Sequence, residues 1–173
     1  MDLGGNSGGL ATAIAQKHPD STIVVVDSKI PCEIGFEFKD INQINNIDFL
    51  EFDFFKLNLP SIDFDYIILS NILHDFDNKN CKKLIQICQK HSNVGTKLLL
   101  IEDILINEFE PQEALLHGLR LATNVKGGRQ RTIAEISELL DEFGYNVDNS
   151  IPLNDVQRLL VAMKFENKVK HRV

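Results

Sequence analysis

Residues 2–9 read Asp-Leu-Gly-Gly-Asn-Ser-Gly-Gly, and this glycine-rich segment constrains the fold more than any other part of the chain. An alanine-rich helical pattern follows it, and then an apolar run, Ile23–Val26, that ends in Asp27. The order of strand end, glycine loop, helix and second strand with a closing acid is typical of a site for a nucleoside-bearing cofactor. Because almost nothing precedes the loop, we expect the first strand to be short.

Strand and helix patterns alternate along the rest of the chain. Besides the short first strand, they predict strands at 21–27, 47–52, 65–69, 97–101, 147–151 and 158–164, and helices at 10–18, 77–92, 110–125 and 132–143. Residues 30–45 match neither period, and 57–64 are predicted to be loop. We therefore predict an α/β fold of the Rossmann-like type. It has an open, mostly parallel, seven-stranded sheet, helices on both faces and a C-terminal antiparallel hairpin.

Three of the predicted helices carry distinct signals. Helix 77–92 places four apolar side chains on its inner face: Cys81, Leu84, Ile85 and Cys88. Helix 110–125 places apolar side chains on one side: Leu115, Leu116, Leu119 and Ala122. The last helix opens with Thr132 and Glu135 at capping-box spacing and is expected to close at Gly144.

Composition excludes several classes of protein. The net charge of -7 disfavours a general nucleic-acid binder, which needs basic patches. No apolar run is long enough to span a membrane, and the N-terminus has no signal-peptide pattern. Cys32, Cys81 and Cys88 lack CxxC spacing, and no cluster of His, Cys and Asp has metal-ligand spacing. A reduced, cytoplasmic protein without a metal is expected.

Ligands of open α/β sheets bind beyond the carboxyl ends of the strands, where strand order reverses. In the predicted fold, four loops lie at that edge: residues 2–9, 27–31, 53–56 and 70–76. Asp27 would accept hydrogen bonds from ribose hydroxyls, although it could instead cap a helix. Asp53 would accept from an adenine amino group and Phe54 would cover the ring, although at least one of Phe54 and Phe55 is expected in the core.

Four segments carry a resemblance to a known family. They are residues 2–9, Asp53-Phe54-Phe55, residues 69–76 (Leu-Ser-Asn-Ile-Leu-His-Asp-Phe) with Cys81, and residues 127–132 (Gly-Gly-Arg-Gln-Arg-Thr). In this order and at similar spacing, they resemble the S-adenosylmethionine-dependent O-methyltransferases of the plant caffeate and hydroxyindole type. The resemblance runs from Asp2 to about Lys164. It implies a class I methyltransferase fold and methyl transfer to a hydroxyl of a small, aromatic acceptor.

The resemblance also implies site residues. His74 matches the histidine that acts as general base on the acceptor hydroxyl, and an imidazole suits this role because its pKa lies near neutrality. Glu102, or its neighbour Asp103, would orient that ring. The residues expected to contact S-adenosylmethionine are Asp2, Gly4, Gly5, Gly8, Asp27, Asp53, Phe54 and Ser70.

Two positions depart from the family pattern. Gln130 stands where the family has a second glutamate, so the imidazolium of His74 would be less stabilised. Asn6 stands where the family usually has a glycine, but asparagine tolerates the left-handed backbone better than most residues. His117 and Asn124 could line an acceptor pocket, although a polar helix face is the simpler interpretation.

The chain resembles only the C-terminal catalytic domain of the family members. We expect residues 1–173 to form one S-adenosylmethionine-binding domain with a truncated first strand and without the helical dimerisation domain that family members carry. The full-length protein is expected to be a homodimer that binds a small hydroxylated acceptor, and neither nucleic acid nor membrane.

Two other functions remain open. The chain could be a non-catalytic, methyltransferase-like domain that binds the cofactor or a partner without turnover, which Gln130 and Asn6 favour. It could also be an NAD-dependent dehydrogenase. However, Asn6 replaces the second glycine of the G-x-G-x-x-G fingerprint, and no Tyr–Lys pair of the reductase type follows.

Overall fold

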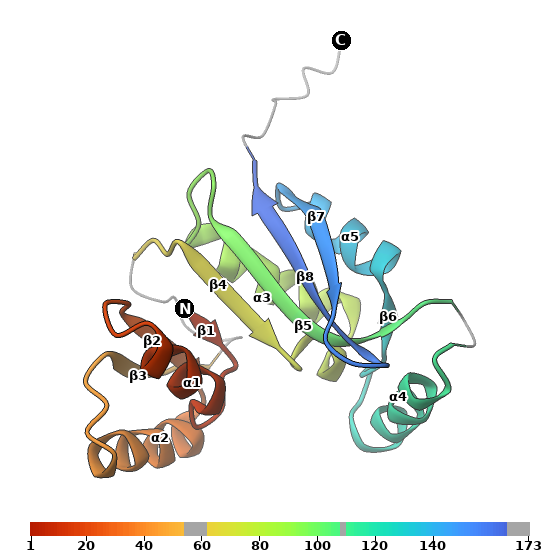
Figure 1. Cartoon of the computed structure of the whole chain (residues 1–173). Coiled ribbons are helices and arrows are strands. Elements are labelled where there is room, and N and C mark those ends of the chain that lie inside the picture. The colour runs from red at the N-terminus through yellow and green to blue at the C-terminus, as the bar shows by residue number, and fades with distance from the viewer. Residues whose placement is uncertain (54–61, 108–109, 166–173) are drawn as a thin grey trace.

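A computed structural model describes residues 1–53, 62–107 and 110–165 of the chain (Figure 1). The N-terminal part alternates strands and helices as far as the third strand. Its elements are β1 (Asp2–Leu3), α1 (Gly9–Lys17), β2 (Ile23–Asp27), α2 (Lys29–Ile41) and β3 (Ile47–Glu51). Residues 54–61, which include Phe54 and part of the predicted loop 57–64, lie outside the described residues.

The second part of the chain supplies the other half of the sheet and the helices α3, α4 and α5. It begins with β4 (Tyr66–Ser70), a short 3₁₀ turn η1 (Leu73–Asp75), α3 (Asn78–Lys90) and β5 (Lys97–Leu105). It continues with α4 (Gln112–Asn124), β6 (Arg131–Thr132), α5 (Ile133–Asp141), β7 (Tyr145–Pro152) and β8 (Gln157–Lys164).

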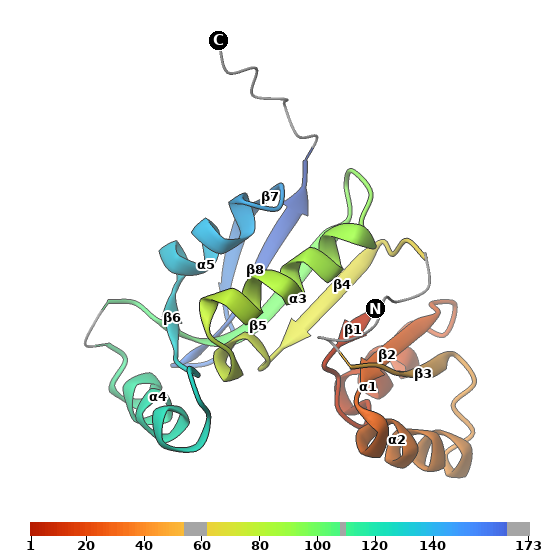
Figure 2. The same cartoon turned by 180° about the vertical axis from the view of Figure 1, so that it is seen from behind.

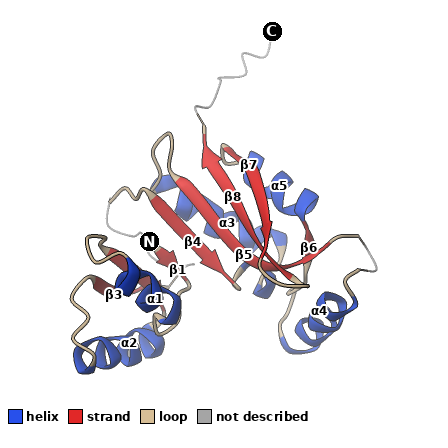
Figure 3. Ribbon diagram, in the orientation of Figure 1, coloured by secondary structure: helices blue, strands red, loops and turns tan. Residues whose placement is uncertain are grey.

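The described strands form one sheet in the order β3-β2-β1-β4-β5-β8-β7, and the short β6 pairs with the end of β5 (Figure 3). Pairing is parallel from β3 through β5, whereas β8 runs antiparallel to both β5 and β7. The predicted mostly parallel sheet with a reversed C-terminal hairpin is therefore confirmed.

The two faces of the sheet carry separate apolar clusters. One cluster packs α1 and α2 on β2 and β3 and includes Ala11, Val25 and Phe49. The other packs α3 and α5 on β4, β5 and β8 and includes Leu100 and Val26. Neighbouring residues Val25 and Val26 thus point to opposite faces, as the pleat of a strand requires. Figures 1 and 2 show α3 and α5 on the same side of β4, β5 and β8.

Besides the short elements η1 and β6, which were not predicted and of which β6 adds an eighth strand to the sheet, three elements differ from the sequence-based expectation. Residues 29–41, which had no clear period, form α2, whose buried side is made of the small residues Cys32 and Gly35. The fifth strand continues four residues beyond the predicted end at residue 101, to Leu105. In α4 only Ala114 is buried, while Leu116 and Leu119 are 64% and 65% exposed. Its apolar side therefore does not pack on the sheet.

Among the described residues, no helix combines the length and the apolar character that crossing a bilayer requires.

Candidate active site

The carboxyl ends of β1, β2, β4 and β5 meet at one edge of the sheet. β1 lies at the switch point, because the chain continues from β1 to β2 on one side and β4 pairs with β1 on the other. The glycine loop follows β1 and η1 follows β4, so both flank this point. Open α/β sheets bind ligands at such a place.

The glycine loop folds through three left-handed residues, Gly4 (φ 77°), Asn6 (φ 52°) and Gly8 (φ 82°). A Cβ on Gly8 would lie 2.8 Å from the ring of Phe49, so this glycine is required by packing as well as by its backbone angle. Asn6 does adopt the left-handed backbone, as expected, and its side chain accepts a hydrogen bond from the Ser7 amide (2.8 Å). The loop thus forms its left-handed turn even though Asn6 stands where the family resemblance implies a glycine.

Asp27 ends β2 and lies beside this loop. Its Oδ2 accepts from the Asn6 amide (2.8 Å), and its Oδ1 accepts from the Ser28 amide (2.7 Å). Oδ1 also accepts from the Ser28 hydroxyl (3.2 Å), so these bonds fix the carboxylate, while Oδ2 retains capacity for a further donor. The alternative role of Asp27 was to cap a helix. Asp27 contacts Ser28 at the start of α2, but the N-cap residue of α2 is Ser28 and not Asp27.

Asp2 is a buried carboxylate at the same edge. It is 1% exposed, and neither of its oxygens has a hydrogen-bond partner among the residues that the structure describes. Burial raises the Asp2 pKa to about 6; the N-terminal ammonium opposes this shift and the charge of Asp27 adds to it. A buried carboxylate without a donor costs free energy, so this position calls for a cationic or hydrogen-bonding ligand.

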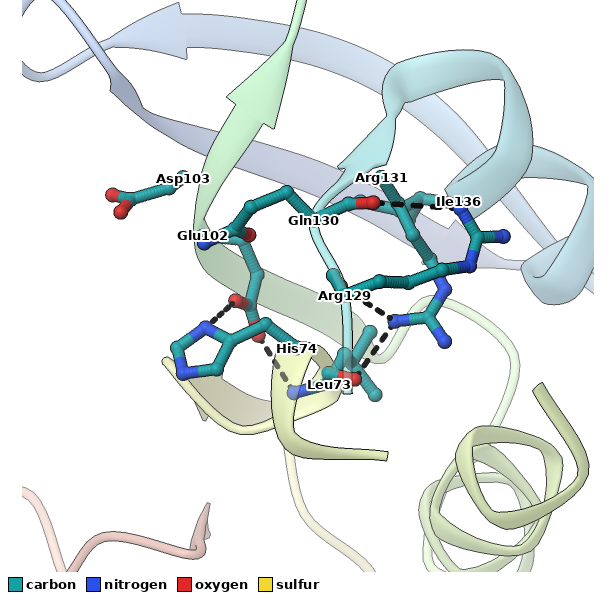
Figure 4. A pocket seen from close by; sticks show the side chains of 8 residues that line it. All are labelled: Leu73, His74, Glu102, Asp103, Arg129, Gln130, Arg131 and Ile136. Carbon is teal, nitrogen blue, oxygen red and sulfur yellow. Dashed lines mark hydrogen bonds and ion pairs between the residues drawn. The ribbon is translucent and has the colours of Figure 1, made fainter. Parts of the chain in front are cut away.

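His74 lies on η1 and contacts a buried carboxylate on β5 (Figure 4). Its Nδ1 lies 2.7 Å from Oε2 of Glu102, while Oε1 of Glu102 accepts from the amides of Ile72 (2.9 Å) and Leu73 (2.7 Å). A carboxylate can only accept, so Nδ1 carries the hydrogen and the Nε2 lone pair is left to take a proton. This is the arrangement of an oriented general base.

The surroundings of His74 adjust its pKa. Burial is the largest influence and lowers the pKa, but the hydrogen bond and charge of Glu102, with the charges of Asp75 and Asp103, outweigh it. The net effect raises the His74 pKa above its ordinary value. The ring therefore binds a proton more readily than a free imidazole does.

Glu102, and not Asp103, is the carboxylate that contacts His74. Residues of β5 alternate between the two faces, and the buried set includes Leu100, Glu102 and Ile104. Asp103 points to the other face and pairs with His117 of α4 (2.6 Å). His117 is thus tied to the sheet, while Asn124 at the end of α4 is exposed.

Gln130 lines the same small hollow as His74 and Glu102 (Figure 4). It is 5% exposed, and its Oε1 has no hydrogen-bond partner within the described part of the chain. A neutral side chain therefore stands next to the dyad where the family resemblance implies a carboxylate.

Sequence reasoning missed Arg131, which is buried beneath η1. Its guanidinium donates to the carbonyl of Leu73 (2.8 Å), the carbonyl of Phe76 (2.7 Å) and Oδ1 of Asn78 (3.0 and 3.1 Å). The available signal was its place in the Gly-Gly-Arg-Gln-Arg-Thr block, one residue before the capping box at Thr132.

The remaining predicted cofactor residues follow the neighbouring strands. Ser70 is the last residue of β4 and pairs with Ile101 of β5. Asp53 follows β3 and is half-buried, two residues beyond its end. Gly5 packs against Asp2, because a Cβ there would lie 2.6 Å from the Asp2 carboxyl carbon. Phe54 lies outside the described residues.

The family can now be assigned by comparison. A family model described as an O-methyltransferase domain matches residues 1–146. The chain belongs to the O-methyltransferase family. Among curated O-methyltransferases, the chicken (Gallus gallus) acetylserotonin enzyme is 34% identical over 145 residues, which are 83% of this chain and 41% of that protein. Cephaeline 6'-O-methyltransferase from Carapichea ipecacuanha is 31% identical over 164 residues, or 90% of this chain and 43% of that protein.

Solved structures agree with this fold. Human N-acetylserotonin methyltransferase in complex with S-adenosylmethionine superposes with a TM-score of 0.82 at 28% identity, covering 94% of this chain and 46% of the other. LaPhzM gives a TM-score of 0.86 at 23% identity over 95% of this chain and 49% of the other, a likeness of fold alone. This O-methyltransferase chain thus spans less than half the length of the curated relatives compared above.

Proposed function

We propose that this chain is the S-adenosylmethionine-binding, catalytic domain of an O-methyltransferase that methylates a hydroxyl of a small aromatic molecule. The observation that carries the proposal is the Nδ1-anchored His74 ring, with its Nε2 lone pair available, at the sheet edge that also holds the glycine loop. Relatives support the acceptor class by name, since they include acetylserotonin and myricetin O-methyltransferases.

The residues at this edge suit S-adenosylmethionine. The fixed carboxylate of Asp27 retains an acceptor position on Oδ2 that would accept from a ribose hydroxyl. Asp2, buried and without a donor, would receive the ammonium of the methionine moiety. In this proposal, the loop that contains Gly4, Gly5 and Gly8 lies along the bound cofactor. Asp53, Phe54 and Ser70 make the remaining contacts with the cofactor.

His74 and Glu102 would carry the proton transfer. When bound, S-adenosylmethionine supplies an electrophilic methyl group on a sulfonium. His74 Nε2 takes the proton of the acceptor hydroxyl, and the nearby carboxylate of Glu102 stabilises the imidazolium that forms. Glu102 also holds η1 through two amides, so the base and the carboxylate that supports it cannot move apart independently.

Calorimetry with S-adenosylhomocysteine tests the cofactor site. We expect binding to the wild-type chain and a loss of at least about tenfold in affinity on Asp27→Ala, since hydrogen bonds to charged groups contribute roughly 1.5–3 kcal/mol. Asp20→Ala is the matched control, because Asp20 is an exposed aspartate that precedes β2 at the opposite edge. Equal affinity of the two variants would refute the role of Asp27.

Cofactor binding without turnover is the second candidate function, and the neutral Gln130 beside His74 favours it. Methyl transfer from labelled S-adenosylmethionine to N-acetylserotonin or to 1,4-dihydroxy-2-naphthoic acid separates the two. The second probe is an acceptor that a solved relative at 27% identity was crystallised with. Methyl transfer by the wild-type chain that is lost in His74→Gln supports catalysis. Tight binding of the cofactor with no methyl transfer to either acceptor supports cofactor binding without turnover.

A further inference from the structure

The turn that carries His74 is held by opposite charges on its two sides. The Glu102 carboxylate accepts from the amides of Ile72 and Leu73, whereas the Arg131 guanidinium donates to the carbonyls of Leu73 and Phe76. Leu73 is therefore bonded through its amide to the anion and through its carbonyl to the cation. Figure 4 shows both contacts on either side of Leu73.

The groups that hold η1 have a common support. β6 pairs with β5 through Ile104 and Arg131, only two residues beyond Glu102 on the same strand. The sheet thus sets the separation between the carboxylate and the guanidinium, and η1 fits between them. Any change in the position of one partner would shift the His74 ring relative to Glu102.

Two further contacts join the same block to η1. The Arg129 amide donates to the carbonyl of His74 (2.9 Å), and a Cβ on Gly128 would lie 2.9 Å from that oxygen. Gly128 must therefore lack a side chain for residues 128–131 to lie directly on the turn. The backbone of Arg129 makes the contact with His74 itself. The side chain of Arg131 bonds the carbonyls of Leu73 and Phe76, at the start and just past the end of η1.

An arginine is suited to this task. Its planar guanidinium presents several donors in fixed directions, so it can bond two carbonyls and the side chain of Asn78 at once. Burial is the largest influence on Arg131 and lowers its pKa, which is the cost of placing a cation here. A lysine would carry the charge but could not hold all three partners in the same geometry.

We propose that Arg131 is a positioning residue for His74, holding η1 so that the imidazole keeps its hydrogen bond to Glu102 and presents Nε2 to the acceptor. The role of His74 as base rests on the proposed function; the positioning of its ring by Arg131 can be measured without turnover. Neither the glycine loop nor Asp27 takes part in this support.

The His74 pKa, measured by NMR on the ring of the full chain, is the decisive readout. The charged groups around His74 are Glu102 and Asp103 of β5, Asp75 of η1, and Arg129 and Arg131 of the adjoining segment. Removing a nearby cation alone would raise the His74 pKa. Loss of the Glu102 hydrogen bond would lower it, so the sign of the change distinguishes positioning from a simple charge effect.

We expect Arg131→Gln to lower the His74 pKa and to reduce kcat on the order of tenfold to a hundredfold, with the affinity for S-adenosylhomocysteine nearly unchanged. Arg131→Lys should recover only part of both. Arg129→Gln is the control for charge: its side chain pairs with Glu135 and does not grip η1, so the His74 pKa should stay equal or rise.

A His74 pKa in Arg131→Gln that equals or exceeds the wild-type value, with only the melting temperature lowered, would overturn the proposal. If that variant does not fold, Asn78→Ala decides. Asn78 is exposed and accepts two of the Arg131 bonds, so its loss should move the His74 pKa in the same direction by less. If the wild-type chain transfers no methyl group, the proposed function fails, but the NMR measurement still tests Arg131.

Discussion

At the residue scale, Glu102 determines both the place and the proton affinity of its neighbour. One oxygen contacts the His74 ring and the other contacts two amides of the turn that carries that ring. A buried carboxylate with three donors is well satisfied, and its negative charge favours a charged imidazole. The His74 pKa is consequently raised even though burial acts in the other direction.

Glu102→Gln should therefore change the pH dependence of methyl transfer. A general base works in its neutral form, so the rate rises as pH passes through the His74 pKa. Without the carboxylate that pKa falls, and the rising limb moves to lower pH while the plateau rate drops, since the imidazolium loses its partner. A pH–rate profile measures both effects.

Asp103→Asn is the matched control for that profile. Asp103 contributes charge to His74 but no hydrogen bond, because it pairs with His117. We expect a smaller shift in the same direction and little change in plateau rate. An equal effect of the two variants would mean that charge alone, and not the bond from Glu102, supports the base.

The sequence allowed part of this site to be predicted. His74 and Glu102 are 28 residues apart, and the family resemblance joined them, but the choice between Glu102 and Asp103 depends on the pleat of β5. Arg131 was missed because its partners lie 53 to 58 residues away, and its place in the Gly-Gly-Arg-Gln-Arg-Thr block does not show which groups it contacts. Local signals predict elements well and long-range polar contacts poorly.

At the scale of elements, α2 shows why residues 30–45 had no readable period. Its inner side is made of Cys32 and Gly35, and Gly35 is needed because a Cβ there would overlap the ring of Phe49. Its larger apolar residues, such as Ile34 and Ile41, are exposed. Small residues inside and large ones outside reverse the pattern from which an amphipathic helix is predicted.

The glycine loop yields a prediction from two adjacent glycines. Gly8→Ala should lower the free energy of unfolding by more than about 1 kcal/mol, since Gly8 is left-handed and a Cβ would press on Phe49. Gly9→Ala should be neutral or stabilising by up to about 1 kcal/mol, because Gly9 starts α1 and a Cβ there meets nothing within 4 Å. Urea denaturation of both variants checks this; similar losses would contradict it.

The predicted capping box at α5 is present. Thr132 accepts from the Glu135 amide (3.2 Å), and Glu135 accepts from the Thr132 amide (2.9 Å). Thr132→Ala should cost about 1 kcal/mol of unfolding free energy. Thr123→Ala, at an exposed position near the end of α4, should change stability by less than about 0.5 kcal/mol. Thermal denaturation would speak against the box if the two variants melted alike.

At the scale of the whole molecule, the mostly parallel sheet and its reversed C-terminal hairpin followed from the alternation of patterns, while the exposure of side chains did not. Helix α4 has the predicted apolar side, yet Leu116 and Leu119 remain exposed beside the sheet. A sequence shows that a helix has an apolar side but does not show what that side meets. The same limit applies to Asp2: the resemblance implied a cofactor contact, but the sequence predicted neither its burial nor its lack of a hydrogen-bond partner among the described residues.

Asp2 links global stability to pH. Its folded-state pKa of about 6 exceeds the ordinary 3.8, so the folded state holds this proton more tightly than the unfolded chain. The Asp2 carboxyl therefore takes almost nothing from the free energy of unfolding below about pH 4. The loss grows as pH rises from the unfolded pKa to the folded pKa of about 6, and it then levels off at about 3 kcal/mol, at 1.36 kcal/mol per pKa unit. Asp2→Asn removes this dependence.

The difference in unfolding free energy between Asp2→Asn and wild type should therefore move in favour of the variant by about 3 kcal/mol from pH 4 to 7.5. Urea denaturation across that range measures it, and taking the difference cancels those titrating groups that do not interact with Asp2; the N-terminal ammonium, whose pKa the Asp2 charge raises, does interact with it. For Asp20→Asn, at an exposed site, the difference in unfolding free energy from wild type should not change with pH.

If Asp2 holds the cofactor ammonium, Asp2→Asn should also weaken S-adenosylhomocysteine binding, so one substitution would stabilise the fold and impair the site. A flat Asp2→Asn difference would show that the carboxylate finds a partner in solution, and the argument for a cationic ligand at this edge would lose its basis.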